Sequence, residues 1–193
     1  WFSYHVKEGN GGSMFVSTYD GMQIYRVGKN GWYPSFSRDY SKMVFWRPIP
    51  NSIIIKNSLG VETNLGSGIS PIINADGTKI VFQDRATAGS WDIFTMDADG
   101  SNRQQLTFDP SVEAAPTFSH DGQQICYLRL PAKGEALVPL ARIMVLPTSG
   151  GTPVAGASVV DTRAPLAYNR FKSRSIGLYV QDTVALTDSV KLI

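Results

Sequence analysis

The sequence predicts an all-β protein made of short antiparallel strands. A twelve-residue unit that opens with proline recurs three times, and a second unit that closes on glycine recurs four times. The chain is rich in Gly, Pro, Ser and Thr, while only 18% of its 193 residues are charged. Many turns and few charges favour short strands joined by tight connections.

The first unit predicts a hairpin of two strands with a tight turn between them. Its copies are PSFSRDYSKMVF (34–45), PIINADGTKIVF (71–82) and PTFSHDGQQICY (116–127). In the last two copies an Asp-Gly pair, Asp76-Gly77 or Asp121-Gly122, supplies the residue of positive φ that such a turn needs. Asp39-Tyr40 replaces this pair in the first copy, so we expect a strained turn or one of another type there.

The second unit predicts another hairpin, in which an apolar strand leads through a glycine turn to a short strand. Its four glycines are Gly21, Gly60, Gly100 and Gly150. The first two intervals are 39 and 40 residues, and an insertion around residues 131–139 lengthens the last by about ten. Four strands in about 40 residues is the period of a β-propeller blade. A β-sandwich also has short strands, but it has no reason to repeat one pattern.

The best-matching stretch, residues 93–127, resembles the repeat of TolB-like propellers, also called WD40-like or PD40 repeats. The pattern is Ile-Phe-x-Met-Asp-x-Asp-Gly with Leu-Thr, then Pro-x-Phe-Ser-x-Asp-Gly-x-x-Ile-x-Tyr, and the resemblance extends over residues 14–154. It implies a propeller fold and, through TolB, a periplasmic or secreted protein of a Gram-negative bacterium. Similar repeats occur in oligopeptidases and polysaccharide lyases, so the resemblance alone does not assign an activity.

The repeat supplies about three and a half four-stranded blades, whereas propellers usually close with four to eight. We therefore expect an incomplete ring, or one completed by a second copy of the chain or by the C-terminal hairpin. The chain begins at Trp1 without Met or a secretory leader, so a missing or processed N-terminus is expected.

The C-terminal segment follows another rule, which divides the chain into a repeat region, 1–157, and a tail, 158–193. Residues 168–193 alternate polar and apolar side chains and resemble a hairpin from the barrel of TonB-dependent receptors. So short a match implies neither transport nor membrane insertion. Two explanations stay open: a junction between two unrelated reading frames, or an ordinary hairpin of coincidental sequence.

The charge distribution gives no reason to expect nucleic acid or anionic lipid as a partner. Lys plus Arg exceeds Asp plus Glu by 2, and no basic run is present. The single cysteine, Cys126, excludes an internal disulfide, and its strand position matches Val44 and Val81, so we interpret it as a small buried hydrophobic residue.

Few residues are suited to catalysis. Of the two histidines, His120 lies in a hairpin turn and is expected to face solvent, while His5 could serve a site. The chain has no Gly-x-Ser-x-Gly motif and no paired-histidine metal motif. Because the related polysaccharide lyases are expected to use a histidine-rich metal site, the lyase interpretation is weakened.

Charged and aromatic residues near the predicted loops are the remaining candidates. The candidate binding residues are Asp84, Arg85, Asp92, Asp109, Glu113, Trp32 and Trp91. Two such carboxylates could form the acid and nucleophile of a glycosidase, and the tryptophans could stack on sugars or anchor a protein. Ordinary solvated loop charges are the competing interpretation. Asp97 and Asp99 resemble the start of a calcium loop, but the distal Glu of such a loop is missing and the repeat places them in a turn, which favours a plain hairpin turn; no other cofactor is expected.

Three functional hypotheses follow. The first is a non-enzymatic module that binds or scaffolds a protein through loops at one propeller face. The second is a carbohydrate-active hydrolase, a glycoside hydrolase that uses loop carboxylates and binds a glycan. The third is a truncated or chimeric fragment without an evolved function of its own.

Overall fold

All regular structure in the described part of the chain is β-strand. A computed structural model describes residues 2–8, 11–18, 20–86, 89–130 and 142–155. The all-β prediction is confirmed. Within these residues no helix is long and apolar enough to span a membrane. The predicted tail hairpin, 168–193, and the proposed boundary at 157 lie outside the described residues.

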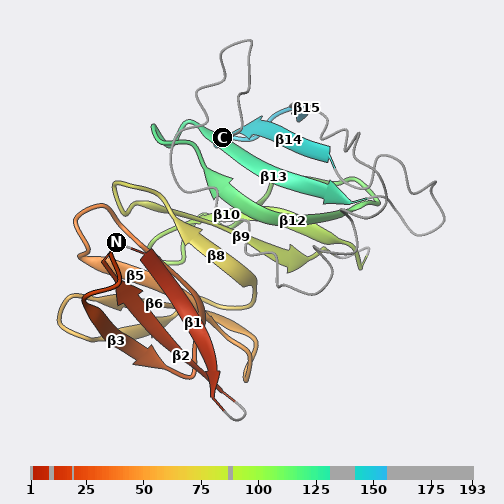
Figure 1. Ribbon diagram of the computed structural model, residues 1–193. Coiled ribbons are helices and arrows are strands. Elements are labelled where there is room, and N and C mark those ends of the chain that lie inside the picture. The colour runs from red at the N-terminus through yellow and green to blue at the C-terminus, as the bar shows by residue number, and fades with distance from the viewer. Residues whose placement is uncertain (1, 9–10, 19, 87–88, 131–141, 156–193) are drawn as a thin grey trace, which may run out of the picture.

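The strands form four antiparallel sheets that follow one another in chain order (Figure 1). Sheet one contains β1 (Phe2–Glu8), β2 (Gly11–Ser17) and β3 (Ile24–Lys29). Sheet two contains β4 (Trp32–Phe36), β5 (Lys42–Arg47), β6 (Ser52–Asn57) and β7 (Glu62–Asn64). Sheet three contains β8 (Ile69–Ile73), β9 (Lys79–Arg85), β10 (Trp91–Asp97) and β11 (Gln104–Gln105). Sheet four contains β12 (Val112–Phe118), β13 (Gln124–Leu130), β14 (Arg142–Pro147) and β15 (Val154–Ala155).

Successive sheets are copies of the repeat, and strand register shows that the described part of sheet one has no first strand. Met14 of β2 occupies the position of Ile53 in β6 and of Ile93 in β10, the third strands of sheets two and three. These residues pair with His5, Trp46 and Gln83 respectively. Strand β1 therefore corresponds to the second strands β5 and β9. The described part of sheet one begins at a second strand, which agrees with the predicted three and a half blades.

Apolar clusters between consecutive sheets hold the sheets together. Met14 of sheet one packs with Phe45 and Ile54 of sheet two. Val44 and Ile53 of sheet two pack with Phe82 of sheet three. The third cluster contains Val81 and Ile93 of sheet three with Ile125, Tyr127 and Met144 of sheet four. Among the described strands, no contact of comparable extent joins the first sheet to the last, so the ring is open.

The three turns between first and second strands share one geometry. In each, a backbone N–H donates to the carbonyl three residues earlier: Tyr40 to Ser37, and Gly77 to Asn74, with Gly122 matching them in the last sheet. Tyr40 has φ 57°, close to 73° at Gly77. The turn at Tyr40 is therefore of the same type as the others, and the alternative of another turn type was wrong. The expected strain is present, because a residue with a Cβ occupies the left-handed region.

Candidate functional site

All seven candidate binding residues lie along one edge of the sheets. We call this the variable edge: it is where β4, β8 and β12 begin and where β5, β9 and β13 end. The opposite edge carries the repeated turns and is called the turn edge. The connections at the variable edge, such as 48–51 and 86–90, differ in length and sequence from sheet to sheet. Strand direction alone places the candidates together, because equivalent strand ends in a repeat meet at the same edge.

Most of the candidates are not loop residues, which corrects the sequence interpretation. Arg85 and Trp91 lie in β9 and β10, and Trp32 begins β4, so only Asp109 lies in a connection. Three carboxylates also lie within strands and are almost fully buried, namely Asp84, Asp92 and Glu113. The interpretation as solvated charges is wrong for these three, since each has polar partners that offset its loss of water.

Asp84 is held by groups of its own sheet and of the preceding connection. Its Oδ2 accepts a hydrogen bond from Ser67 Oγ at 2.6 Å and forms an ion pair with Arg103. The Arg103 guanidinium also donates to the Ser67 carbonyl at 3.0 Å. It lies 4.5 Å from the centroid of the Phe82 ring, at cation–π distance. The Asp84 carboxylate is thus occupied by intramolecular partners.

Glu113 and Asp109 share one arginine. Glu113 is completely buried, and its Oε1 accepts from Arg129 Nη2 at 3.3 Å and from Arg129 Nε at 3.4 Å. Arg129 Nη1 lies 3.5 Å from Asp109 Oδ2 nearer the surface. Burial raises the pKa of Glu113, and contacts with Thr107 and Arg129 only partly offset this. The hydrogen bonds from Ser111 lower the pKa of Asp109.

The repeat explains why Glu113 is unusual. In sheets two and three the same position, three residues before the proline, is Gly31 and Gly68. A Cβ on Gly31 would lie 2.5 Å from Phe45, and one on Gly68 would lie 2.7 Å from Phe82. In sheet four Tyr127 takes the place of these phenylalanines. A buried Glu–Tyr pair therefore replaces a close glycine–aromatic contact.

Two polar atoms of this pair are buried without a hydrogen bond of ordinary geometry to any described residue. They are Glu113 Oε2 and the Tyr127 hydroxyl. Burial raises the pKa of Tyr127 to about 12, and the neighbouring charge of Glu113 acts in the same direction. Burial thus disfavours the charged form of both groups.

Asp92 is the third buried carboxylate. Its Oδ2 accepts from Ser90 Oγ and from Gln105 Nε2, each at 3.0 Å. Burial raises its pKa, and the charge of Asp109 adds to this effect. Asp92 also lies directly opposite Asp84 in the β9–β10 pair. Two like charges facing each other across a strand pair are unfavourable, so the Arg103 and Gln105 contacts offset a built-in repulsion.

Aromatic residues continue the variable edge over sheets one and two. The His5 ring lies 4.6 Å from that of Trp32 and 4.9 Å from that of Tyr33, and Tyr33 stacks on Trp46 at 6.2 Å. Burial lowers the pKa of His5, which favours its neutral form. In sheet three, Arg85 lies over the Trp91 ring at 5.2 Å. His5 thus packs as an aromatic residue.

A surface hollow of about 570 Å³ lies beside Arg129 and Asp109. Its polar lining includes Gln105, Thr107, Asp109 and Arg129, and the Gly150–Gly151 turn borders it. Glu113 and Asp92 do not line the hollow. A molecule in this hollow would contact Asp109 and Arg129 but neither of the two buried carboxylates.

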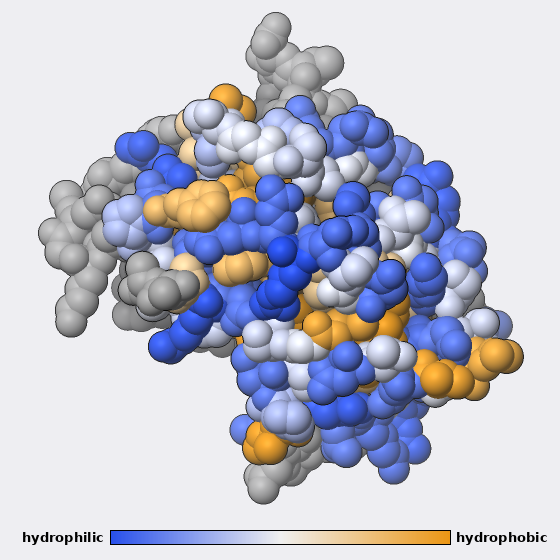
Figure 2. Space-filling model, turned by 180° about the vertical axis from the view of Figure 1, so that it is seen from behind, coloured by the Kyte–Doolittle hydropathy of each residue, from blue (hydrophilic) through white to orange (hydrophobic). Residues whose placement is uncertain are grey.

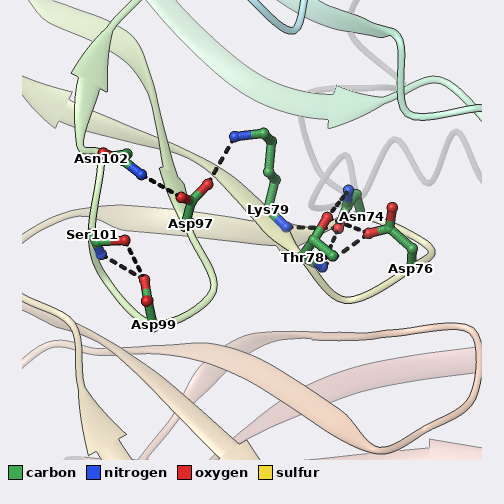
Figure 3. A network of polar contacts seen from close by, with 8 residues as sticks. All are labelled: Asn74, Asp76, Thr78, Lys79, Asp97, Asp99, Ser101 and Asn102. Atoms are coloured by element: carbon green, nitrogen blue, oxygen red, sulfur yellow. Dashed lines mark hydrogen bonds and ion pairs between the residues drawn. The ribbon is translucent and has the colours of Figure 1, made fainter.

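The calcium candidates are engaged in the turn of sheet three. Asp97 accepts from Lys79 Nζ at 2.8 Å and from Asn102 at 2.6 Å, whereas Asp99 accepts from the Ser101 hydroxyl at 2.6 Å (Figure 3). These contacts lower the pKa of both carboxyls. Among the described residues, no group of three or more His, Cys, Asp or Glu side chains is arranged to hold a metal ion. The geometry is that of a hairpin turn.

The remaining candidates for chemistry are placed as follows. His120 is exposed in its turn, as expected, and its Nε2 lies 3.1 Å from Arg38 Nη2 of sheet two. Cys126 occupies the strand position of Val44 and Val81, but it is only half-buried, whereas both valines are fully buried. The expectation that it is buried was therefore too strong, because sheet four has no described sheet beyond it.

Sequence reasoning missed the cations that hold the carboxylates, Arg103 and Arg129, and the buried Tyr127. The alignment of repeats contained a signal for two of them. Arg129 aligns with Asp84, and Tyr127 aligns with Phe82, so sheet four differs from sheet three at neighbouring positions of one strand. A concerted change of this kind indicates a local polar cluster.

No protein-family model matches the chain, and no curated protein does. Solved structures do match. A putative TolB from Agrobacterium tumefaciens is 20% identical with a TM-score of 0.67, over 79% of this chain and 59% of that one. TolB from Acinetobacter baumannii is 22% identical with a TM-score of 0.64, over 79% and 39%.

A third match is the β-propeller domain of the Trilobed protease from Pyrococcus furiosus, which has an open velcro topology. It is 12% identical with a TM-score of 0.53, over 82% of this chain and 58% of that one. The chain thus spans between about two-fifths and three-fifths of these neighbours. Together with the four consecutive sheets and their shared turn, these matches show that the chain has the TolB-like β-propeller fold.

Proposed function

We propose that the chain is a non-enzymatic binding module that holds a protein partner at its variable edge. The observation that carries the proposal is the exposure of large apolar side chains there. Ile49, Phe108 and Tyr33 are 82%, 76% and 44% exposed. Aromatic and arginine side chains are enriched in protein interfaces, and Arg85, Trp91 and Trp46 flank this set.

The surface suits several contacts better than one deep ligand pocket. Figure 2 shows hydrophobic side chains in separate patches among hydrophilic ones on the face that it displays. The variable edge combines exposed apolar residues with ion pairs that are already formed, such as Asp109–Arg129. An interface of this kind excludes water from a few anchors without having to assemble new charge pairs.

The buried carboxylates argue against the glycoside hydrolase alternative. A glycosidase needs two carboxyl groups that reach the scissile bond. Asp92 and Glu113 are 1% and 0% exposed, and Asp84 is bound to Arg103. Of the four candidate carboxylates, only Asp109 reaches the surface hollow. One accessible carboxylate does not make an acid and nucleophile pair.

The TolB likeness supports a periplasmic location, and it supports a binding role in preference to catalysis. Since the chain spans only part of these neighbours, the role is proposed for the described propeller sheets alone.

The test is an affinity capture with the immobilised chain and a periplasmic extract from a Gram-negative bacterium, followed by calorimetry with each identified protein. Ile49→Ala and Phe108→Ala are expected to weaken binding about 30-fold if these residues are interface anchors. Leu59→Ala is the matched control, because Leu59 is 86% exposed in the β6–β7 turn at the turn edge. Equal binding by all three variants, or a glycan that binds and is cleaved, would reject the proposal.

A further inference from the structure

The exposed charged side chains at the two edges of the sheets differ in sign. At the turn edge, exposed carboxylates occupy most of the hairpin turns: Asp20, Asp39, Asp76, Asp99 and Asp121. In each case a hydroxyl and a backbone N–H of the same turn donate to the carboxylate, which lowers the pKa of the carboxyl. These aspartates are therefore ionised at neutral pH.

The cations at the turn edge offset these charges only in part. Lys79 Nζ is bound to Asp97 Oδ1 at 2.8 Å, and Lys42 Nζ donates to the Gly77 carbonyl at 2.8 Å. Arg38 is exposed at this edge. Carboxylates thus outnumber cations there, and the turn edge presents a negative surface.

The variable edge has the opposite arrangement. Its carboxylates Asp84, Asp92 and Glu113 are buried, and Asp109 is paired with Arg129. The exposed charged side chains described at this edge are cations at or near strand ends: Lys7, Lys29, Arg85 and Arg142. None of them forms an ion pair with a carboxylate of the described residues. The variable edge therefore presents a positive surface.

Two of these cations follow the repeat. Register places Lys7 and Arg85 at the same position of the second strand, two residues after His5 and Gln83. The Arg85 guanidinium lies 5.2 Å from the centroid of the Trp91 ring. An aromatic ring contacts the face of a guanidinium, so the N–H donors at the rim of that group remain available to a carboxylate of a partner.

Arg142 faces a like charge. It lies directly opposite Arg129 in the β13–β14 pair, and like charges at such positions are unfavourable. Arg129 is bound to Glu113 and Asp109, whereas Arg142 is exposed and has no ion pair with any described residue. A carboxylate supplied by another molecule beside Arg142 would offset this repulsion.

We propose that the protein partner presents an acidic surface to the variable edge, with carboxylates facing the exposed cations there. This inference rests on the proposed function and names the chemistry of its partner. Separate cations beside exposed apolar anchors fit a protein surface of acidic and apolar side chains, whereas nucleic acid is bound by a basic stripe that follows the phosphates. The negative turn edge repels an acidic partner, so the two edges together orient its approach.

Calorimetric titration of the 193-residue chain with poly-L-glutamate tests the charge assignment. The titration is made at about 0.1 M salt, where exposed charges more than about 10 Å apart are largely screened from each other. Arg85→Glu and Arg142→Glu are each expected to weaken binding about 10-fold. Lys7→Glu, at the same repeat position, replaces Arg85→Glu if that variant unfolds. Arg38→Glu is the matched control, because it makes the same change in net charge at the turn edge and should bind as the wild type does.

Several outcomes would overturn the inference. They are no binding of poly-L-glutamate by the wild type, equal weakening by Arg38→Glu, and tighter binding of duplex DNA or of phosphatidylglycerol vesicles at the same salt concentration.

The variants also separate this inference from the proposed function. If Ile49→Ala and Phe108→Ala weaken a captured protein while Arg85→Glu and Arg142→Glu do not, the binding role stands and the acidic partner is rejected. If poly-L-glutamate binds as expected but no protein depends on Ile49 and Phe108, the positive surface stands and the proposed function is rejected.

Discussion

Alanine at position 113 should destabilise the fold far more than alanine at position 109, although both residues bind the same arginine. Glu113 is fully buried and accepts two bonds from Arg129. Removing one partner of a buried ion pair typically costs about 3–5 kcal/mol. The Arg129 side chain is 24% exposed and keeps Asp109 at 3.5 Å, so we expect a loss of about 2–4 kcal/mol.

Asp109→Ala is the matched comparison. Its side chain is 35% exposed and its ion-pair distance is longer, so the expected loss is below about 1 kcal/mol. The assay is urea unfolding followed by tryptophan fluorescence. With a denaturant dependence of about 2 kcal/mol per molar urea, Glu113→Ala should lower the midpoint by about 1–2 M.

A double mutant isolates the pair. Glu113→Ala with Arg129→Ala should cost less than the two single changes added together, because no unpaired buried charge is left. Equal losses for Glu113→Ala and Asp109→Ala, or additive losses in the double mutant, would refute the argument that burial of Glu113 makes this pair strong.

Three further predictions concern the turn, the buried carboxyls and the thiol. Tyr40→Gly should raise the free energy of unfolding by about 0.5–1 kcal/mol, because glycine adopts the left-handed conformation without strain. Gly77→Ala should lower the free energy of unfolding for the converse reason, and urea unfolding measures both. A lower free energy of unfolding for Tyr40→Gly would show that loss of the Phe36–Tyr40 ring contact outweighs the relief of strain. Because the pKa of Asp92 is raised in the folded chain, its folded form keeps a proton to higher pH, so its contribution to stability falls as pH rises above about 4. Melting temperatures of Asp92→Asn between pH 4 and 7 should therefore fall less with rising pH than those of the wild type, and parallel curves would contradict this. Burial raises the pKa of the Cys126 thiol. At pH 8 the thiol should therefore react with Ellman's reagent more slowly than glutathione does, and it should react fully in urea. A rate equal to that of glutathione would argue against its burial.

The fold was predictable because its repeat consists of local residue patterns. The twelve-residue unit and the Asp-Gly turns predicted the strands, and the glycine intervals predicted the period of the repeat. The type of the turn at Tyr40 was not predictable from residue preference. Pairing of the two flanking strands imposes the left-handed conformation on Tyr40, although tyrosine adopts it poorly.

The shared edge of the candidate residues follows from the repeat, but their placement within strands and their chemistry were not predictable. Strand order placed Asp84, Asp92 and Glu113 at one edge, yet their burial depends on partners distant in sequence. Arg103 reaches Asp84 from 19 residues away, and Arg129 reaches Glu113 from 16 residues away. Pairing over such separations is set by packing of strands and sheets, which no local pattern encodes.

The exchange of glycine for Glu113 also makes the blades non-interchangeable. In sheets two and three a glycine lies close to a phenylalanine of its own sheet and to Met14 or Ile53 of the preceding sheet, whereas sheet four has a carboxylate, a phenol and a guanidinium at this place. Moving sheet four to another place in the chain would set that carboxylate beside the wrong neighbour. The polar cluster of sheet four is thus matched to sheet three, so a rearranged chain in which another sheet precedes sheet four should be less stable than the natural order.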